Sequence, residues 1–275
     1  MAVFREGVPC WADAMLPDVE AGKRFYGELF GWTFDKETHT EYGIRRAGYR
    51  EYHYREYLVA RSEDRTVAAL APKRDGRMPT VWTVYFATPD LAALTERVRQ
   101  EGGQLVTGPV PVGTQGMLAL VADPEGAVFG LWEGGACAGF EKWRETDSVV
   151  WTEVYAREET VVDAFYERVL GFGALDLLDG GAGVRMWSPA GSEPTPDTVI
   201  GCRRRVSDVF PAEMPPHFLV HFGVADCEAA VAAVTRLGGR VRVDPFEVPY
   251  GRMAVVSDNQ GAEFAVLQRT PVVLT

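Results

Sequence analysis

The chain uses one pattern of residues twice, and this duplication restricts its possible folds more than any other feature. The first copy covers residues 10–18 and 24–32, and the second covers residues 150–158 and 164–172. Each copy reads as a strand, an acidic helix start, an amphipathic helix carrying Phe-Tyr, and a Gly-aromatic exit. A period of roughly 135 to 140 residues is far longer than a solenoid repeat. It indicates two homologous domains.

The repeat continues past these copies. Asp90 and Asp226 each begin a second helix, because aspartate is a favoured helix N-cap. After each of these helices come two strands joined by a turn that opens with Asp and closes with Gly. Each domain therefore reads as two units of a strand, a helix and several strands. We expect domains at residues 1–135 and 145–270, joined by small residues at 134–139.

Charge and composition restrict the partners. The net charge is −11, which argues against nucleic acid or an anionic membrane, since both need a basic face. No run approaches the ~18 apolar residues of a membrane span, and residues 1–7 have no apolar signal core, so we expect a cytoplasmic protein. The cysteines are far apart and form no C-x-x-C pair, which fits a reducing compartment; they are Cys10, Cys137, Cys202 and Cys227.

A tryptophan and an acid stand two residues apart on the first strand of each domain. These pairs are Trp11 with Asp13 and Trp151 with Glu153. Successive side chains of a strand point to opposite faces of the sheet, so each pair shares one face. We place one binding site on each of these faces.

The two acids have two open interpretations. A carboxylate in an apolar site has its charged form disfavoured, so its pKa should rise, and Asp13 or Glu153 could then act as a general acid or base. His221, on the strand that opens the last unit, could be the partner of Glu153. Alternatively, each acid accepts hydrogen bonds from the backbone or a tyrosine and anchors its strand.

The whole pattern resembles the vicinal oxygen chelate superfamily, which includes glyoxalases, bleomycin-resistance proteins and extradiol dioxygenases. The resemblance is carried by Phe25-Tyr26 ahead of residues 29–32, by the Asp90 and Asp226 helix starts, and by the turn at residues 123–126. It implies an α+β fold of two tandem domains. Each domain would pair two βαβββ units into one curled mixed sheet with an open cup that binds the ligand.

Metal-dependent members of this superfamily place His, Glu or Gln at three strand positions of a cup. The matching positions here hold other residues; they are Trp11, Thr83 and Gly130 in the first domain and Trp151, Leu219 and Ala265 in the second. Divalent metals need several nitrogen, oxygen or sulfur donors. We therefore expect no catalytic metal and no cofactor.

The remaining cup residues fit a small organic ligand. Aromatic rings with a few polar groups are typical of such sites, and the expected lining beside the two tryptophans is Tyr155, Thr83 and Tyr85. Arg252, near the expected rim, could meet an anionic ligand or only a neighbouring acid. Trp11 and Trp151 could also be plain core residues.

Three functions remain in competition. The first is a metal-free protein that binds a small hydrophobic or aromatic metabolite, for sequestration or biosynthesis. The second is a metal-independent isomerase, cyclase or lyase of secondary metabolism that uses Asp13, Glu153 or His221 for proton transfer. The third, a metal-dependent lyase or dioxygenase, is disfavoured by the missing ligands. The expected partner is a small molecule, and the chain should be a monomer or a homodimer.

Overall fold

The computed structural model describes residues 4–37, 57–73, 75–177, 183–206, 215–248 and 250–270. Two domains follow one another, each built from two βαβββ units. The elements of the N-terminal domain are β1 (Pro9–Leu16), α1 (Val19–Phe30), β2 (Thr33–Glu37), β3 (Tyr57–Ser62), β4 (Arg65–Pro72), β5 (Trp82–Ala87), α2 (Leu91–Gln100), β6 (Gln104–Val112), β7 (Gly116–Ala122) and β8 (Val128–Gly134).

The C-terminal domain repeats this order. Its elements are β9 (Val149–Ala156), α3 (Glu159–Leu170), β10 (Gly173–Leu177), β11 (Val184–Ser188), β12 (Gly201–Arg205), β13 (His217–Gly223), α4 (Cys227–Arg236), β14 (Arg240–Val248), β15 (Gly251–Ser257) and β16 (Glu263–Arg269). The expected tandem α+β fold is therefore confirmed.

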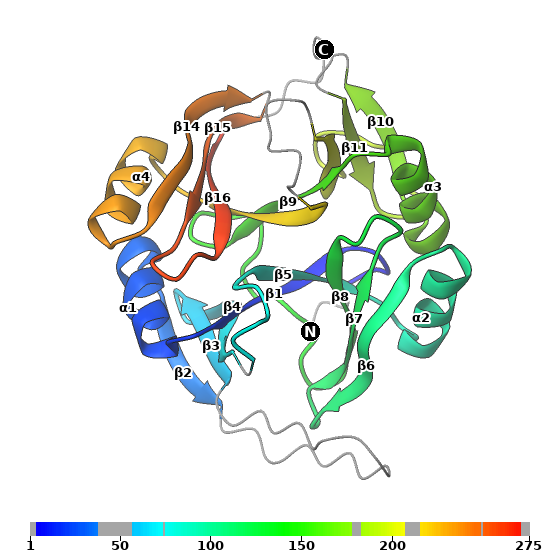
Figure 1. Ribbon diagram of the computed structural model, residues 1–275, viewed down its shortest axis with the longest axis horizontal. Coiled ribbons are helices and arrows are strands. Elements are labelled where there is room, and N and C mark those ends of the chain that lie inside the picture. Colours follow the sequence, from blue (N-terminus) through cyan, green and yellow to red (C-terminus); the bar gives the residue numbers. More distant parts are fainter. Residues whose placement is uncertain are drawn as a thin grey trace.

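Each domain forms one eight-stranded mixed sheet. The strand order is β2-β3-β4-β1-β5-β8-β7-β6 in the first sheet and β10-β11-β12-β9-β13-β16-β15-β14 in the second. The first strands of the two units, β1 with β5 and β9 with β13, pair antiparallel at the centre of each sheet. Each sheet curls without closing into a barrel and forms a cup, and the two cups open on opposite sides of the molecule (Figure 1).

Helix capping explains why the helices begin where the sequence predicts. The carboxylates of Asp18, Asp90 and Asp226 accept hydrogen bonds from backbone N–H groups three residues later. Gly31 and Gly171 end α1 and α3 in the left-handed conformation, which glycine adopts without steric cost. Among the described residues, no helix is long and apolar enough to cross a membrane.

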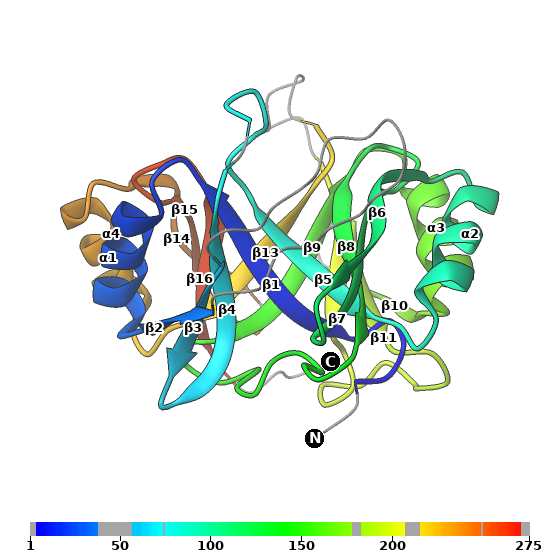
Figure 2. The same ribbon diagram turned by 90° about the horizontal axis from the view of Figure 1, so that it is seen from below.

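The two sheets pack back to back through aromatic rings. The ring of Trp82 on β5 lies 4.9 Å from that of Phe222 on β13, and the ring of Phe86 lies 5.8 Å from that of Phe218. Helix α1 lies beside α4 and α3 lies beside α2 on the flanks (Figures 1 and 2). Because this shared core takes one face of each central strand, the opposite face is left for the cup.

The Phe-Tyr repeat links the two domains. The Tyr26 hydroxyl of α1 donates to Asp258 Oδ2 of the C-terminal domain at 2.9 Å, and the Tyr166 hydroxyl of α3 donates to Asp123 Oδ2 of the N-terminal domain at 3.1 Å. Each acceptor is the Asp that opens the turn before the last strand of its domain. Each helix is thus tied to the turn of the other domain, which fixes the two sheets relative to each other.

Candidate functional site

The N-terminal cup holds a cluster of hydrogen-bonded side chains around Asp13. Trp11 and Asp13 face the same side of β1, opposite Tyr85 and Thr83 of β5. The Tyr85 hydroxyl donates to Asp13 Oδ2 at 3.1 Å, and the Tyr57 hydroxyl of β3 donates to the same oxygen at 3.2 Å. Trp11 Nε1 in turn donates to the Tyr57 hydroxyl at 2.7 Å. Trp11, Asp13 and Tyr85 therefore belong to one hydrogen-bonded cluster, and Tyr57 joins them.

Burial controls the charge of Asp13. Its side chain is only 4% exposed, and desolvation raises its pKa from 3.8 to about 7, although the hydrogen bonds from Tyr85 and Tyr57 act in the opposite direction. Asp13 Oδ1 is buried and has no hydrogen-bond partner within the described part of the chain. The cup thus presents a carboxyl oxygen that can donate a hydrogen bond when protonated and accept one when ionised.

The C-terminal cup places a charged network at the matching position. Arg204 Nε of β12 donates to Glu153 Oε2 at 3.2 Å, and the Tyr250 hydroxyl donates to Glu153 Oε1 at 2.6 Å. His221 Nε2 lies 3.7 Å from Glu153 Oε2. Glu153 and His221 are both fully buried. The expected Glu153–His221 pairing is therefore close in space, with Arg204 as the stronger partner of the acid.

The pKa of Glu153 moves in the opposite direction to the one expected from the sequence. Burial by itself would raise it, but the charge of Arg204, the electrostatic effect of His221 and the Tyr250 hydrogen bond lower it to about 2. Burial lowers the pKa of His221 to about 4, with Glu153 opposing this change. At neutral pH the cup therefore contains an ionised Glu153–Arg204 pair and a neutral imidazole.

Several polar atoms of this second cup have no hydrogen-bond partner within the described ranges. They are Trp151 Nε1 and both ring nitrogens of His221. The Trp151 ring packs on that of Tyr250 at 5.5 Å, and Trp151 is 8% exposed. Tyr155 stacks on His217 at 5.2 Å with nearly parallel rings. Trp151 and Tyr155 thus lie inside the molecule on the cup side of β9, as the alternation of the strand predicts.

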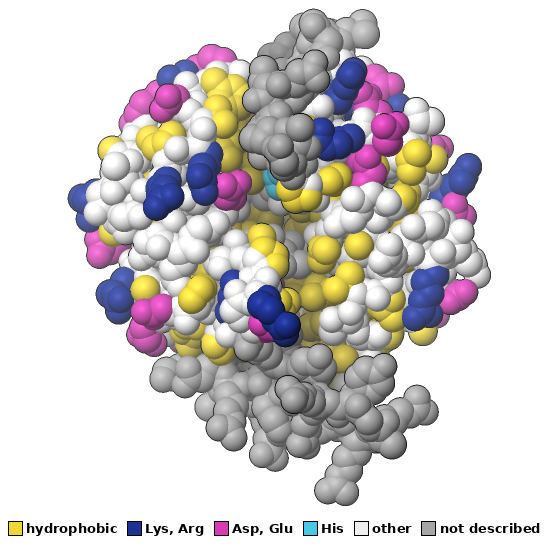
Figure 3. Space-filling view, viewed as in Figure 1, with side chains coloured by type: hydrophobic (Ala, Val, Ile, Leu, Met, Phe, Trp, Pro, Cys, Tyr) yellow, Lys and Arg dark blue, Asp and Glu magenta, His cyan; other side chains and the backbone are white. Residues whose placement is uncertain are grey.

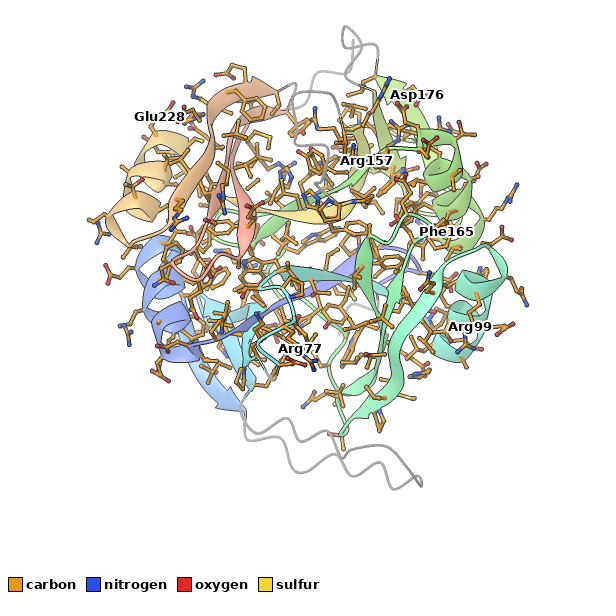
Figure 4. The ribbon with its side chains drawn as sticks, in the orientation of Figure 1. Arg77, Arg99, Arg157, Phe165, Asp176 and Glu228 are labelled. Atoms are coloured by element: carbon orange, nitrogen blue, oxygen red, sulfur yellow. The ribbon has the colours of Figure 1, made fainter. Side chains whose placement is uncertain are left out.

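Two further predicted ligand-binding residues, Arg252 and Thr83, have different surroundings. Arg252 on β15 pairs with Glu228 of α4 and, at 2.9 Å, with Glu247 of β14. Glu228 lies on the outer edge of the molecule (Figure 4), so the structure shows Arg252 with neighbouring acids, one of the two alternatives that the sequence leaves open. Thr83 on β5 lies opposite Asp13 of β1 and on the same side of the sheet. It also lines an apolar cavity of about 620 Å³ at the seam between the domains. Hydrophobic side chains gather along this seam (Figure 3).

Three site residues escaped the sequence analysis: Tyr57, Arg204 and Tyr250. In the arginine run at residues 203–205, Arg203 is buried against Asp163 of α3 and Arg204 faces Glu153. Strand alternation alone would have separated these two arginines onto opposite faces. Tyr57 begins β3 and Tyr250 lies in the short turn between β14 and β15, and neither belongs to the repeated pattern.

The fold and these two cups define the class of protein. The family profile described as the glyoxalase/bleomycin resistance protein/dioxygenase superfamily matches residues 11–131 and 163–266. The chain belongs to this superfamily.

The chain is also similar to relatives of nearly the same length. It is 34% identical over 282 residues to "Anthracycline biosynthesis protein DauV" of a Streptomyces species, covering 98% of this chain and 95% of the relative. It is 32% identical over 273 residues to "Putative glyoxylase CFP32" of Mycobacterium tuberculosis, covering 98% and 97%.

Solved structures agree on the fold. A Mn(II)-bound glyoxalase from Novosphingobium aromaticivorans superimposes with a TM-score of 0.61 at 13% identity, covering 98% of this chain and 84% of that one. A 2,2',3-trihydroxybiphenyl 1,2-dioxygenase from Sphingomonas wittichii gives 0.61 at 13% identity, covering 98% and 92%. At such low sequence identity, the likeness to these structures shows the fold alone.

The residues of the two cups do not fit a catalytic metal. Within the ranges that the structure describes, no three His, Cys, Asp or Glu side chains gather as a metal would require. In the N-terminal cup, the Tyr85 ring fills the space next to Gly130, where an added Cβ would lie 2.0 Å from it. In the C-terminal cup, Arg204 already offsets the charge of Glu153.

Proposed function

We propose that this protein binds a planar aromatic metabolite in its N-terminal cup, without a metal or another cofactor. The observation that carries the proposal is the Trp11–Tyr57–Asp13–Tyr85 cluster, which puts aromatic surface beside a carboxyl oxygen with an open hydrogen-bonding position. Rings supply stacking area, and one well-placed polar group sets the orientation of a ligand.

The relatives support an aromatic ligand of secondary metabolism. Two Streptomyces relatives at 34% identity are named for anthracycline biosynthesis, and an anthracycline is a fused-ring aromatic compound with hydroxyl and carbonyl oxygens. Such an oxygen could meet Asp13 Oδ1 while the rings lie against Trp11. One chain supplies both domains, so a monomer suffices for this role and a homodimer is compatible with it.

Fluorescence titration in the presence of a chelator tests this proposal. The probe is an anthracycline, and the signal is the quenching of tryptophan emission. Trp11→Leu should weaken binding by roughly five- to tenfold through lost stacking, whereas the matched Trp151→Leu in the other cup should not. The proposal fails if no saturable binding occurs, if binding needs an added divalent metal, or if only Trp151→Leu weakens it.

A second candidate is a metal-independent enzyme that uses Asp13 as a general acid or base. The observation that favours it is the pKa of about 7, which lets Asp13 exchange a proton near neutral pH. Asp13→Asn separates the two functions. A binder should hold its ligand within a few-fold of the wild-type affinity, while an enzyme should lose turnover with binding largely kept.

The C-terminal cup is the weaker candidate for proton transfer. Glu153 is held by Arg204 and Tyr250, and His221 has a pKa of about 4, so neither group changes protonation near neutral pH. We assign Glu153 the role of anchoring β9 to β12. We therefore assign Glu153 a structural role and keep proton transfer as an alternative for Asp13 alone.

A further inference from the structure

An arginine pair lies at the linker between the two domains, away from the N-terminal cup. A cavity of about 550 Å³ opens there between the linker and the C-terminal ends of β13 and β16. Its charged lining consists of Glu63, Lys142, Arg144, Glu145 and Arg269. Cations are in the majority at this cavity although the chain as a whole carries a net charge of −11.

The acids of this cavity are already neutralised by other cations. Arg65 binds Glu145 through two hydrogen bonds, at 2.8 and 2.7 Å. Glu63 lies 3.3 Å from Arg65 and 3.4 Å from Lys142. Neither carboxylate is therefore left to balance the arginine pair.

Arg144 and Arg269 bind only backbone carbonyls within the described part of the chain. Arg144 Nη1 donates to the carbonyl of Asp197 at 3.1 Å, and Arg269 Nη1 donates to the carbonyl of Arg144 at 3.0 Å. No carboxylate pairs with either guanidinium there, in contrast to Arg236 and Arg252, which pair with acids. Burial and then the charge of Arg269 lower the pKa of Arg144, and the charge of Asp197 opposes this change. The two guanidinium groups thus repel each other, and the carboxylate of Asp197, which forms no ion pair with Arg144, offsets this only in part.

The backbone of Arg144 adopts an unfavourable conformation. Its φ is +63°, in the left-handed region that non-glycine residues rarely adopt. Its guanidinium lies 5.6 Å from the ring centre of Trp143. The same two arginines also line a smaller cavity that reaches Trp151 and Tyr250 of the C-terminal cup.

We propose that the Arg144–Arg269 pair binds the phosphate group of a phosphorylated small molecule. Guanidinium groups bind phosphate oxygens bidentately, and a phosphate monoester carries close to two negative charges at neutral pH. Two arginines that form no ion pair with a carboxylate of the described residues match that charge. The cavity is larger than a phosphate ion alone, so it leaves room for an organic part.

Isothermal titration calorimetry on the full chain tests this site. Phenyl phosphate, inorganic phosphate and acetate are titrated at one ionic strength set with chloride. Phenyl phosphate should bind with one site per chain, and acetate should not bind. Tighter binding of phenyl phosphate than of inorganic phosphate assigns the site to a phosphate ester, while equal affinities assign it to free phosphate.

The variants test the residues. Arg269→Gln should weaken phosphate binding by about tenfold or more, because a charge-assisted bidentate contact is lost. Arg269→Lys, which keeps the charge and loses the planar fork, should weaken it less. Arg236→Gln removes an equal charge from a distant exposed position and should leave binding unchanged. Three results would overturn the proposal. They are a heat of phosphate binding no larger than that of the chloride blank, tighter binding of acetate than of phosphate, and an unaltered phosphate affinity in folded Arg269→Gln.

Discussion

The ring of Tyr85 lies directly against Gly130 across two neighbouring strands of the N-terminal sheet. A Cβ on Gly130 would stand 2.0 Å from Cδ1 of that ring. The hydroxyl of the same ring donates to Asp13 at 3.1 Å. The Tyr85 side chain thus fills the space beside Gly130, the position that holds a metal ligand in metal-dependent members of the superfamily. The same side chain also holds Asp13 through its hydroxyl.

Gly130→Ala should destabilise the fold by about 1–3 kcal/mol, because the new methyl group has no room beside Tyr85. Urea denaturation measures this change. Gly76→Ala is the matched control, since a Cβ on Gly76 meets nothing within 4 Å. In a Tyr85→Ala background the cost of Gly130→Ala should largely disappear. An unchanged midpoint for Gly130→Ala alone would show that the ring moves freely.

Asp13→Asn should remove a pH dependence of stability. Folding raises the pKa of Asp13 from 3.8 to about 7, so its stabilising contribution is complete below pH 3.8 and is lost as the pH rises to about 7. Between pH 5 and pH 7 the wild type should lose roughly 2 kcal/mol of unfolding free energy from this group. The asparagine variant should lack this decline and be the more stable protein at pH 8. Parallel slopes in the two proteins would contradict the assignment.

Glu153→Gln should destabilise the protein by about 3–5 kcal/mol at pH 7, because it leaves the partly buried Arg204 without a counter-charge. Folding lowers the pKa of Glu153 from 4.5 to about 2, so its contribution is present above pH 4.5 and is lost as the pH falls toward 2. The penalty should therefore shrink near pH 3. The double variant Glu153→Gln/Arg204→Met should recover much of the loss. If it were less stable than the single variant, the pair would not be coupled as described.

Tyr26→Phe and Tyr166→Phe form a matched pair at the domain interface. Each removes a hydrogen bond to a buried acid of the opposite domain, which should cost about 1–3 kcal/mol. Tyr26→Phe should cost more, because Trp82 Nε1 also donates to the Tyr26 hydroxyl at 2.9 Å. Thermal unfolding should keep one transition in both variants. Two separate transitions would show that the domains fold independently of this contact.

The sequence predicted the fold well because its signals are local. The caps Asp90 and Asp226 and the exits Gly31 and Gly171 act within a few residues of the helices they limit. Their repetition then indicates the duplication without any knowledge of strand pairing.

The site was only half predictable because its charges are set by distant residues. Strand alternation put Trp11 and Asp13 on one face correctly. No local pattern in the sequence indicates that Arg204, 51 residues after Glu153, holds that acid ionised. The direction of the change in the pKa of Glu153 depends on this contact. The expected rise in pKa thus occurs at Asp13 and has the wrong sign for Glu153.

The pH dependence of ligand affinity tests the central claim most directly. An anthracycline is titrated calorimetrically from pH 5.5 to 8.5 in the presence of a chelator, with wild type and Asp13→Asn compared. If protonated Asp13 donates to a ligand oxygen, wild-type affinity should be flat below pH 7 and fall by about tenfold per pH unit well above it, while the variant stays flat. Binding that vanishes in chelator, or the same pH profile in both proteins, would contradict a metal-free site centred on Asp13.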